Sequence, residues 1–578
     1  MNHFALRQFR LFTKLAVLAL TLTTLNVIAG VERAEAESVI SQLGDDIDGE
    51  ATSDLSGYSV ALSSDGTIVA IGARENDGAG DKSGHVRVYQ YDSGSWTQLG
   101  DDIDGEAGSL SGSSVSLSSD GTIVAIGAIW AASKKGHVRV YQYSGGSWTK
   151  LGDDIDGEAE DDYSGESVSL SSDGTRVAIG ATQNDGANGT DSGHVRVYGY
   201  DGVDGDEDGI DKWTQIGGDL DGEAVSDFSG RSVSLSADGT RVAIGADGNN
   251  GANGTDSGHV RVYGYDGVDG DGDGINKWTQ LGGDIDGEAA FDGSGQSVSL
   301  SSDGTRVAIG ARDNDGGGTD SGHVRVYQYD SGSWTQIGGD IDGEAATDQS
   351  GRSVSLSADG TRVAIGAAAN DGGGTSSGHV RVYQYDSGSS TWTQIGEDID
   401  GEAADDYSGS RVALSSNGAR LAIGAYGNDG NGRGAGHVRV FSISSTPSST
   451  SSTSSTARED AGTPGIFLTV HGRSGITLSG TQVQFGAYAI QPGSPYIVSI
   501  REENNLSSQR VLASGRATSG GHLDESLALP NLPAGSHTVV FSAYNTAGAR
   551  LILGNTITVD STGTITTVSP ENLQPTIR

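Results

Sequence analysis

The chain has 578 residues, a formal net charge of −42 and no cysteine. This charge argues against nucleic acid and anionic membranes as partners, because both would be repelled. The length is ample for one large domain and a smaller one. An exported protein without disulfides must depend on packing, ring closure or bound ions for its stability.

The N-terminal segment has the pattern of a secretory signal. Arg7, Arg10 and Lys14 precede an apolar run over residues 15–30, and Ala34 and Ala36 offer a small-x-small cleavage site. The alternative, an uncleaved anchor, is disfavoured because the run is short and is interrupted by threonines and an asparagine. We therefore expect a signal peptide over 1–36, a secreted or cell-surface location, and no transmembrane segment after cleavage.

A repeat dominates the next 400 or so residues. Seven copies of GHVRVY or its near twin recur at intervals of 52 to 65 residues, and seven copies of DIDGEA or DLDGEA accompany them. The GHVRVY copies begin at Gly84, Gly136, Gly193, Gly258, Gly322, Gly378 and Gly436. Self-similarity at such a period is typical of propellers and solenoids.

Each repeat contains four runs that alternate or are rich in β-branched and aromatic residues, as strands are. In the fifth repeat these runs are 297–301, 306–311, 323–329 and 334–338. The first two are joined by a turn containing Asp-Gly, a strong hairpin signal. Four antiparallel strands that repeat radially describe the blade of a β-propeller.

The two ends of the repeat region predict closure into a ring. Residues 39–44 resemble an unattached outer strand, whereas the last repeat ends without one. The N-terminal strand would complete the seventh blade and cover two exposed edges. We therefore predict an all-β fold with a seven-bladed β-propeller over 38–443, present as a monomeric ring. The alternative, an open solenoid, would need caps.

Two acidic insertions are the candidate metal sites. They read DGVDGDEDGIDKW and DGVDGDGDGINKW, and alternate carboxylates followed by glycine can wrap one hard cation. The alternative is an acidic, solvated turn. The predicted calcium ligands are Asp204, Asp206, Asp208 and Asp211 in the first insertion, and Asp269, Asp271, Asp273 and Asn276 in the second.

The motifs WTQLGDDIDGEA, SVSLSSDGT, VAIGA and GHVRVY resemble the FG-GAP type of propeller repeat found in exported bacterial proteins. The resemblance covers about residues 38 to 443 and implies an architecture similar to the integrin α head, adhesion or interaction roles, and calcium in some loops. The repeat is also similar to a WD repeat, which implies nearly the same fold, although its strand ends in Tyr or Phe where a WD repeat has Trp-Asp.

Other recurring residues have structural interpretations. The topology predicts that the NDG-type loops and the DIDGEA segments share one acidic face, where the DIDGEA carboxylates accept hydrogen bonds. The GHVRVY histidines, such as His85, are expected to make hydrogen bonds between loops. A zinc site is disfavoured, because zinc would need several such side chains to converge on one ion. Their neighbouring arginines are expected to neutralise carboxylates, and the outer-strand tryptophans to pack between blades.

Beyond the ring, residues 444–465 are rich in Ser, Thr and Pro, which predicts a flexible linker. Strand-like runs over 466–568 predict a β-sandwich, and residues 569–578 form a tail. The run LPNLPAGSHTVVFSAYNTAGARLILGNTITV resembles bacterial Ig-like surface domains, which implies a spacer or adhesive module.

The sequence predicts an exported binding or adhesion scaffold that holds a protein or glycan ligand on its acidic loop face. We expect it not to be an enzyme, because nearly every polar residue recurs in most repeats and no unique nucleophile stands out. Two alternatives stay open at this stage. One is a glycan-binding lectin; the other is a polysaccharide-active enzyme, which a unique pocket of unlike carboxylates would support.

Overall fold

The computed structural model describes residues 40–200, 202, 212–267 and 277–444, together with eight strands between residues 465 and 569. The chain divides into two compact units, residues 1–448 and 449–578. Within the described part, no helix combines the length and the apolar character needed to cross a bilayer.

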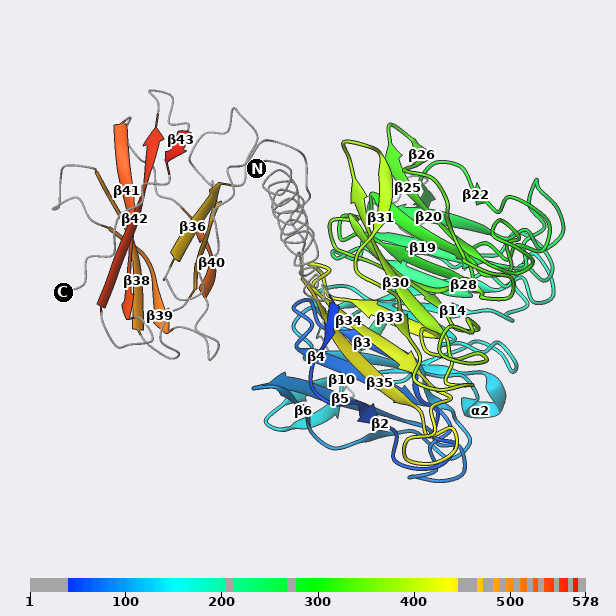
Figure 1. Ribbon diagram of the computed structural model, residues 1–578. Helices are drawn as coiled ribbons and strands as arrows, with labels where there is room; N and C mark the ends of the chain where they lie inside the picture. The colour runs from blue at the N-terminus through cyan, green and yellow to red at the C-terminus, as the bar shows by residue number, and fades with distance from the viewer. Residues whose placement is uncertain are drawn as a thin grey trace, which may run out of the picture. The chain divides into compact units, whose positions relative to one another are not determined.

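The first unit contains seven antiparallel sheets of five strands each, and these follow one another around an axis (Figure 1). It is a seven-bladed β-propeller, as the repeat predicts. Four strands of each blade pair in chain order, except that in the last blade the fourth strand is the first strand of the chain. The fifth is the Ile-Asp (or Leu-Asp) pair of the DIDGEA segment, which adds to the third strand, as in the register His323↔Asp342. This short fifth strand was not predicted.

The strands have corresponding bounds in all blades. The innermost strands are β3 (Ser56–Leu62), β8 (Ser111–Leu117), β13 (Ser167–Leu170), β18 (Ser232–Leu235), β23 (Ser297–Leu300), β28 (Ser350–Leu356) and β33 (Arg411–Leu414). The second strands are β4 (Ile68–Ala73), β9 (Ile123–Ala128), β14 (Arg176–Ala181), β19 (Arg241–Ala246), β24 (Arg306–Ala311), β29 (Arg362–Ala367) and β34 (Arg420–Ala425). The third strands are β5 (His85–Asp92), β10 (His137–Ser144), β15 (His194–Tyr200), β20 (His259–Tyr265), β25 (His323–Asp330), β30 (His379–Asp386) and β35 (His437–Ile443).

The outer part of each blade is shorter. The fourth strands are β6 (Ser95–Gln98), β11 (Ser147–Lys150), β16 (Trp213–Gln215), β21 (Trp278–Gln280), β26 (Ser333–Gln336), β31 (Thr391–Gln394) and β1 (Ile40–Gln42). The fifth strands are β7 (Ile103–Asp104), β12 (Ile155–Asp156), β17 (Leu220–Asp221), β22 (Ile285–Asp286), β27 (Ile341–Asp342), β32 (Ile399–Asp400) and β2 (Ile47–Asp48). A helical turn, α2 (Ala131–Lys134), lies in the shortened loop of the second blade.

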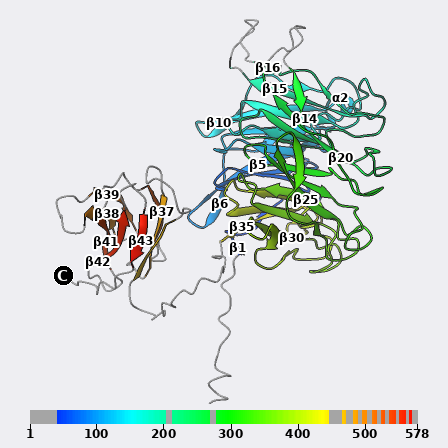
Figure 2. The ribbon, with the colours of Figure 1, turned by 90° about the horizontal axis from the view of Figure 1, so that it is seen from above.

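The N-terminal strand closes the ring, as predicted. Strand β1 pairs with β35 in the register Ile40↔Ile443, and β2 pairs with the same strand at Ile47↔Val438. Figure 2 shows β1 beside β35. The first strand of the chain therefore completes the last blade, and the outer edge of that sheet is covered.

A second closure lies at the inner end of the blades. The backbone N–H of the first residue in each Ser-Asp-Gly, Ala-Asp-Gly or Ser-Asn-Gly turn donates to the carbonyl of the same residue in the next blade, and the bonds measure 2.8–2.9 Å. The circuit runs Ser64, Ser119, Ser172, Ala237, Ser302, Ala358, Ser416 and back to Ser64. These bonds tie the seven innermost turns into one circle.

The apolar core lies between neighbouring blades. One cluster joins Val260 and Val262 of one blade to Val307 and Ile309 of the next, and all four are at most 1% exposed. Burial of such side chains supplies most of the driving force for packing the blades. The tryptophans pack at the same interfaces, as predicted: the Trp334 indole N–H donates to the carbonyl of Leu281 at 2.7 Å.

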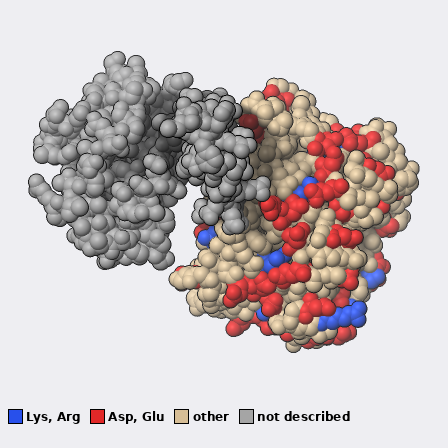
Figure 3. Space-filling view, in the orientation of Figure 1, with Lys and Arg blue, Asp and Glu red and all other residues tan. Residues whose placement is uncertain are grey.

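The loops that were predicted to share a face do so. The Asn76 side chain donates to the Asp54 carboxylate at 3.0 Å, which joins an NDG-type loop to the DIDGEA segment. The same carboxylate accepts the Ala51 backbone N–H at 2.9 Å. Figure 3 shows many Asp and Glu side chains, and few Lys and Arg, over the visible surface of the propeller.

The second unit is made of β-strands. Its sheets have the orders β36-β37-β40 and β39-β38-β41-β42-β43, with antiparallel pairing throughout. The strands are β36 (Gly465–Val470), β37 (Gln482–Tyr488), β38 (Pro495–Glu502), β39 (Arg510–Arg516), β40 (Leu523–Ala528), β41 (Gly535–Tyr544), β42 (Arg550–Val559) and β43 (Ile565–Ser569).

Candidate functional site

One position of the repeat differs from blade to blade, and it lies at the ring axis. It is the residue between Ser-Gly and Ser-Val at the start of the innermost strand, and in the last blade an arginine also replaces the following serine. The residues are Tyr58, Ser113, Glu166, Arg231, Gln296, Arg352 and Ser410 with Arg411. This position was not predicted from the sequence, because the repeat is defined by the residues that its copies share and the copies differ here.

All of these residues except Tyr58 and Ser410 line a cavity of about 230 Å³. Residues from the innermost strands of all seven blades line it, so it lies on the axis of the ring. Its wall includes Arg231, Arg352 and Arg411, together with the carboxylate of Glu166. An acidic protein thus carries a cluster of arginines in its central channel.

Arg231 connects two carboxylates. Its Nη1 lies 2.7 Å from Glu166 Oε1, and its Nε lies 3.6 Å from Asp247 Oδ2. Burial raises the pKa of the Asp247 carboxyl above its ordinary value, although the charges of Arg231 and Arg312 oppose the shift. Glu166 accepts a short, charge-assisted hydrogen bond, whereas Asp247 has the longer contact, so the two carboxylates occupy unlike environments.

Two other arginines of this region have a nitrogen without a hydrogen-bond partner among the described residues. The Nε groups of Arg74 and Arg352 are buried without a hydrogen-bond partner. Burial lowers the pKa of Arg411, and the positive charges of Arg352 and Arg231 act in the same direction. A guanidinium stays protonated in proteins even so. The cavity therefore concentrates positive charge and N–H donors that an anion would satisfy.

Aromatic rings flank the same cluster. The guanidinium of Arg74 lies 3.7 Å from the centroid of the Tyr58 ring, and that of Arg411 lies 5.6 Å from it. Tyr407 and Tyr426 stack with a centroid distance of 5.3 Å and an interplanar angle of 7°. The two cation–π contacts with Tyr58 hold Arg74 and Arg411 in place.

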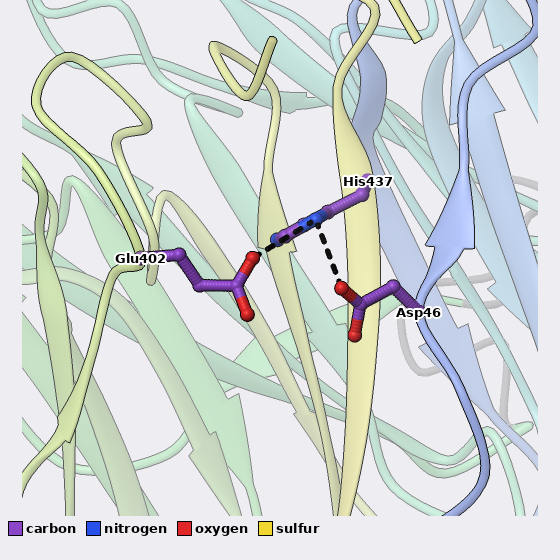
Figure 4. A group of neighbouring side chains, drawn as sticks. All are labelled: Asp46, Glu402 and His437. Carbon is purple, nitrogen blue, oxygen red and sulfur yellow. Dashed lines mark ion pairs between the residues drawn. The ribbon is translucent and has the colours of Figure 1, made fainter. Parts of the chain in front are cut away.

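A second arrangement recurs at the rim of the acidic face. The histidine that begins the third strand faces a glutamate and an aspartate, both from DIDGEA segments. Figure 4 shows this group for His437, whose Nδ1 lies 3.9 Å from Asp46 Oδ2 and 4.0 Å from Glu402 Oε2. These distances exceed hydrogen-bond range, so the two carboxylates do not make the hydrogen bonds that were expected for this histidine.

The arginine that follows each such histidine neutralises a carboxylate, as predicted. Arg87 Nη1 lies 3.4 Å from Glu50 Oε1, and its Nη2 donates to the backbone carbonyl of Asp48 at 2.8 Å. The predicted calcium ligands lie outside the described residues: Asp204, Asp206, Asp208, Asp211, Asp269, Asp271, Asp273 and Asn276. Their prediction is untested.

Comparisons with known proteins concern the fold. No family model matches the chain, and no curated protein matches it. The periplasmic gluconolactonase of Pseudomonas aeruginosa is similar in structure, with a TM-score of 0.39 and 17% identity over 60% of this chain and 85% of that one. Prolyl oligopeptidase B from Galerina marginata has a TM-score of 0.37 and 12% identity, covering 75% and 56%. The β-propeller domain of the Trilobed protease from Pyrococcus furiosus has a TM-score of 0.33 and 10% identity, covering 66% and 91%.

The prediction of a non-enzymatic binding or adhesion scaffold, and with it the expectation that the chain is no enzyme, is corrected here. The similar structures carry the names of a lactonase and of peptidases, and their likeness to this chain is one of fold alone. The physical reason for the error lies in the axial position. The argument against chemistry assumed that polar residues repeat in every blade, whereas Glu166, Arg231 and Asp247 each differ from their counterparts in most of the other blades.

Proposed function

We propose that the propeller is a hydrolase that acts on a small anionic substrate in its axial cavity. The observation that carries this proposal is that Arg231, in the wall of the axial cavity, contacts two carboxylates of unlike environment, Glu166 of the same wall and Asp247 of the loop after β19. Arg352 and Arg411 share that wall, and among the described residues neither has an ion pair. Pairs of titratable groups in differing environments are the usual source of acid and base roles. A volume of about 230 Å³ restricts the substrate to a small molecule or to the end of a larger one.

In this proposal the two carboxylates have separate tasks. Asp247, whose pKa is raised by burial, is the general acid that protonates the leaving oxygen. Glu166 is the general base that takes a proton from the attacking water. Arg352 and Arg411 bind the anionic group of the substrate and place the scissile ester, lactone or glycosidic bond beside the carboxylates.

Anion binding is tested first, by thermal melting of the full chain with sulfate, phosphate or gluconate. We expect each effective anion to raise the melting temperature, since a ligand that binds only the native state stabilises it. The variants Arg352→Met and Arg411→Met should lose this shift. Gln296→Ala, at an uncharged position of the same ring, is the matched control and should keep it.

Hydrolysis is then tested with chromogenic esters and glycosides and with aldonolactones, each with and without an anionic group. We expect turnover of at least one anionic substrate, and a loss of about 100-fold or more in kcat in Glu166→Gln and Asp247→Asn. The proposal is overturned if no anion shifts the melting temperature, or if the wild-type protein hydrolyses nothing faster than the double variant.

The finer sequence predictions are retained as proposals. We infer an FG-GAP-type repeat in the ring, an Ig-like fold for the second unit, and an extracytoplasmic location after signal cleavage. N-terminal sequencing of the protein from its native host tests the cleavage near Ala36. Calcium in the two acidic insertions is tested by melting with and without chelator, and an unchanged midpoint at millimolar calcium would remove it.

A further inference from the structure

Each histidine–carboxylate group brings together side chains from two neighbouring blades. In each group the glutamate comes from the segment that precedes a blade, while the histidine and the aspartate belong to that blade. Among the described residues, six groups of three side chains each place one ligand atom per side chain within 4.8 Å of the other two, and five of them are histidine–carboxylate groups named here. These groups are Glu50–His85–Asp102, Glu158–His194–Asp219, Glu223–His259–Asp284, Glu288–His323–Asp340 and Glu402–His437–Asp46. In a sixth blade His379 lies 3.8 Å from Asp398.

The imidazole in these groups has unsatisfied bonding capacity. His437 is 1% exposed, and its Nδ1 points between Glu402 and Asp46 at distances too long for hydrogen bonds (Figure 4). The Nε2 atoms of His259, His379 and His437, on the side of the ring away from the carboxylates, are also buried without any hydrogen-bond partner. The observation that points to a ligand is the buried Nδ1, which faces two carboxylates but is hydrogen-bonded to neither.

The carboxylates are held so that one oxygen of each faces the histidine. In the first blade Arg87 contacts Oε1 of Glu50 while Oε2 faces His85 at 3.9 Å. The Gln98 amide donates to Oδ1 of Asp102 at 2.6 Å while Oδ2 faces His85 at 3.8 Å. Supporting hydrogen bonds that orient ligand atoms in this way are characteristic of metal sites.

In the second blade, a positively charged side chain lies between the equivalent glutamate and aspartate. There the guanidinium of Arg139 contacts Asp154 through Nε at 3.0 Å and Nη2 at 2.8 Å, and contacts Glu106 through Nη2 at 2.6 Å. Lys150, which replaces the glutamine of the other blades, donates to Asp154 at 2.7 Å. The equivalent carboxylates thus close around a positive group when one is present.

We propose that each of the histidine–carboxylate groups outside the second blade binds a divalent transition-metal ion of the zinc class, which clasps two neighbouring blades. The imidazole nitrogen favours zinc-class ions over calcium and magnesium, which prefer oxygen ligands alone. Three ligand atoms that each lie about 2.0–2.2 Å from one ion are at most about 3.8 Å apart. The ion would therefore draw the carboxylates, which lie 3.8–4.0 Å from the Nδ1 atoms of His85 and His437, slightly inward. The sequence analysis dismissed such a site because it required several histidines, whereas one histidine with two carboxylates suffices.

Because each site also has an arginine within 4 Å of its glutamate and leaves that glutamate partly exposed, we expect weak, exchangeable binding.

The test measures how many zinc ions the full chain binds, by equilibrium dialysis against Zn²⁺ with metal analysis. Co²⁺ serves as a spectroscopic probe of the ligands, and Ca²⁺ and Mg²⁺ serve as comparison ions. We expect zinc to bind with a capacity of about one ion per such blade and to raise the melting temperature. The variants His437→Gln and Glu402→Gln should each bind one ion fewer; Glu402 is partly exposed, so its substitution leaves the core intact.

The second blade supplies the opposite test. The double variant Arg139→Met/Lys150→Gln frees Glu106 and Asp154 beside His137, so we expect it to bind one ion more than the wild type. The proposal is overturned if both the glutamate and the histidine variants bind as many ions as the wild type. It is equally overturned if the double variant gains none, because the arginine would then not stand in the place of an ion.

Discussion

The backbone N–H of Ser416 donates a 2.9 Å hydrogen bond to the carbonyl oxygen of Ser64, although 352 residues separate the two. Their side-chain hydroxyls are also 2.8 Å apart. This pair closes the inner circle of turns, while β1 on β35 closes the outer edge of the same blade. The ring is thus closed at the hub and at the rim, and the two closures can be perturbed separately.

Weakening the rim closure should destabilise the propeller. Ile40 packs against the apolar cluster of the last blade, next to Ile443. Since Ile40 is only partly buried, we expect Ile40→Ala to lower the free energy of unfolding by about 1–2 kcal/mol. Urea denaturation measures the change. Ser41→Ala, on the exposed side of the same strand, is the control. It removes only a solvent-exposed hydrogen bond between the hydroxyls of Ser41 and Ser442, so it should fall within about 0.5 kcal/mol of the wild type.

The spacing of the blades depends on glycine in the second strand. A Cβ atom on Gly310 would lie 2.0 Å from the carbonyl oxygen of Gly351 in the next blade. We expect Gly310→Ala to cost more than about 4 kcal/mol or to prevent folding, because the clash is with backbone. Gly339→Ala is the matched control, since nothing lies within 4 Å of its added Cβ. Equal stability of the two variants would contradict this account.

The repeat sequence sufficed to predict the number of blades, the closing strand and the shared loop face, because each depends on local patterns that occur seven times. Residues 39–44 and the missing final strand gave the closure directly. The fifth strand was not predictable in the same way, since two residues such as Ile341 and Asp342 carry too little pattern to mark a strand.

The axial site was missed for a different reason. A repeat is recognised by averaging over its copies, and averaging removes positions at which the copies differ. Glu166, Arg231 and Arg352 occupy one such position. That they meet at the axis, and that Asp247 reaches Arg231 from a neighbouring loop, follows only from the closed ring.

Acid should destabilise the propeller through its Asp-Gly turns. Partial burial alone would raise the pKa of Asp303, but hydrogen bonds from the Thr305 backbone and from the Ser301 and Thr305 hydroxyls outweigh it, so its pKa is lowered. A carboxyl with a lowered folded-state pKa binds fewer protons than in the unfolded chain. Its contribution is therefore complete above the ordinary value of 3.8 and is lost as the pH falls through the lowered pKa. The pKa is lowered likewise at Asp65, Asp120, Asp173, Asp238 and Asp359.

The last blade contains the natural control for this effect. Asn417 accepts hydrogen bonds from Ser415 and from the Ala419 backbone without a charge. We expect Asp303→Asn to keep the turn, to cost up to about 1 kcal/mol at pH 7, and to show a smaller deficit at pH 3. Urea denaturation at both pH values measures this, and a deficit that grows toward low pH would refute the assignment.

For the rate of hydrolysis, the planar guanidinium geometry of Arg231 should matter more than its positive charge. A guanidinium contacts Glu166 and Asp247 through different nitrogens, whereas the ammonium of lysine is a single point charge on a flexible stem. We therefore expect Arg231→Lys to lower kcat on the anionic substrate by at least about tenfold, because the two carboxylates lose their common partner. The anion-induced rise in melting temperature should change much less, since Arg352 and Arg411 remain. Activity that survives in Arg231→Lys but falls in Arg231→Met would show that charge alone suffices. The two carboxylates would then not act as a positioned pair.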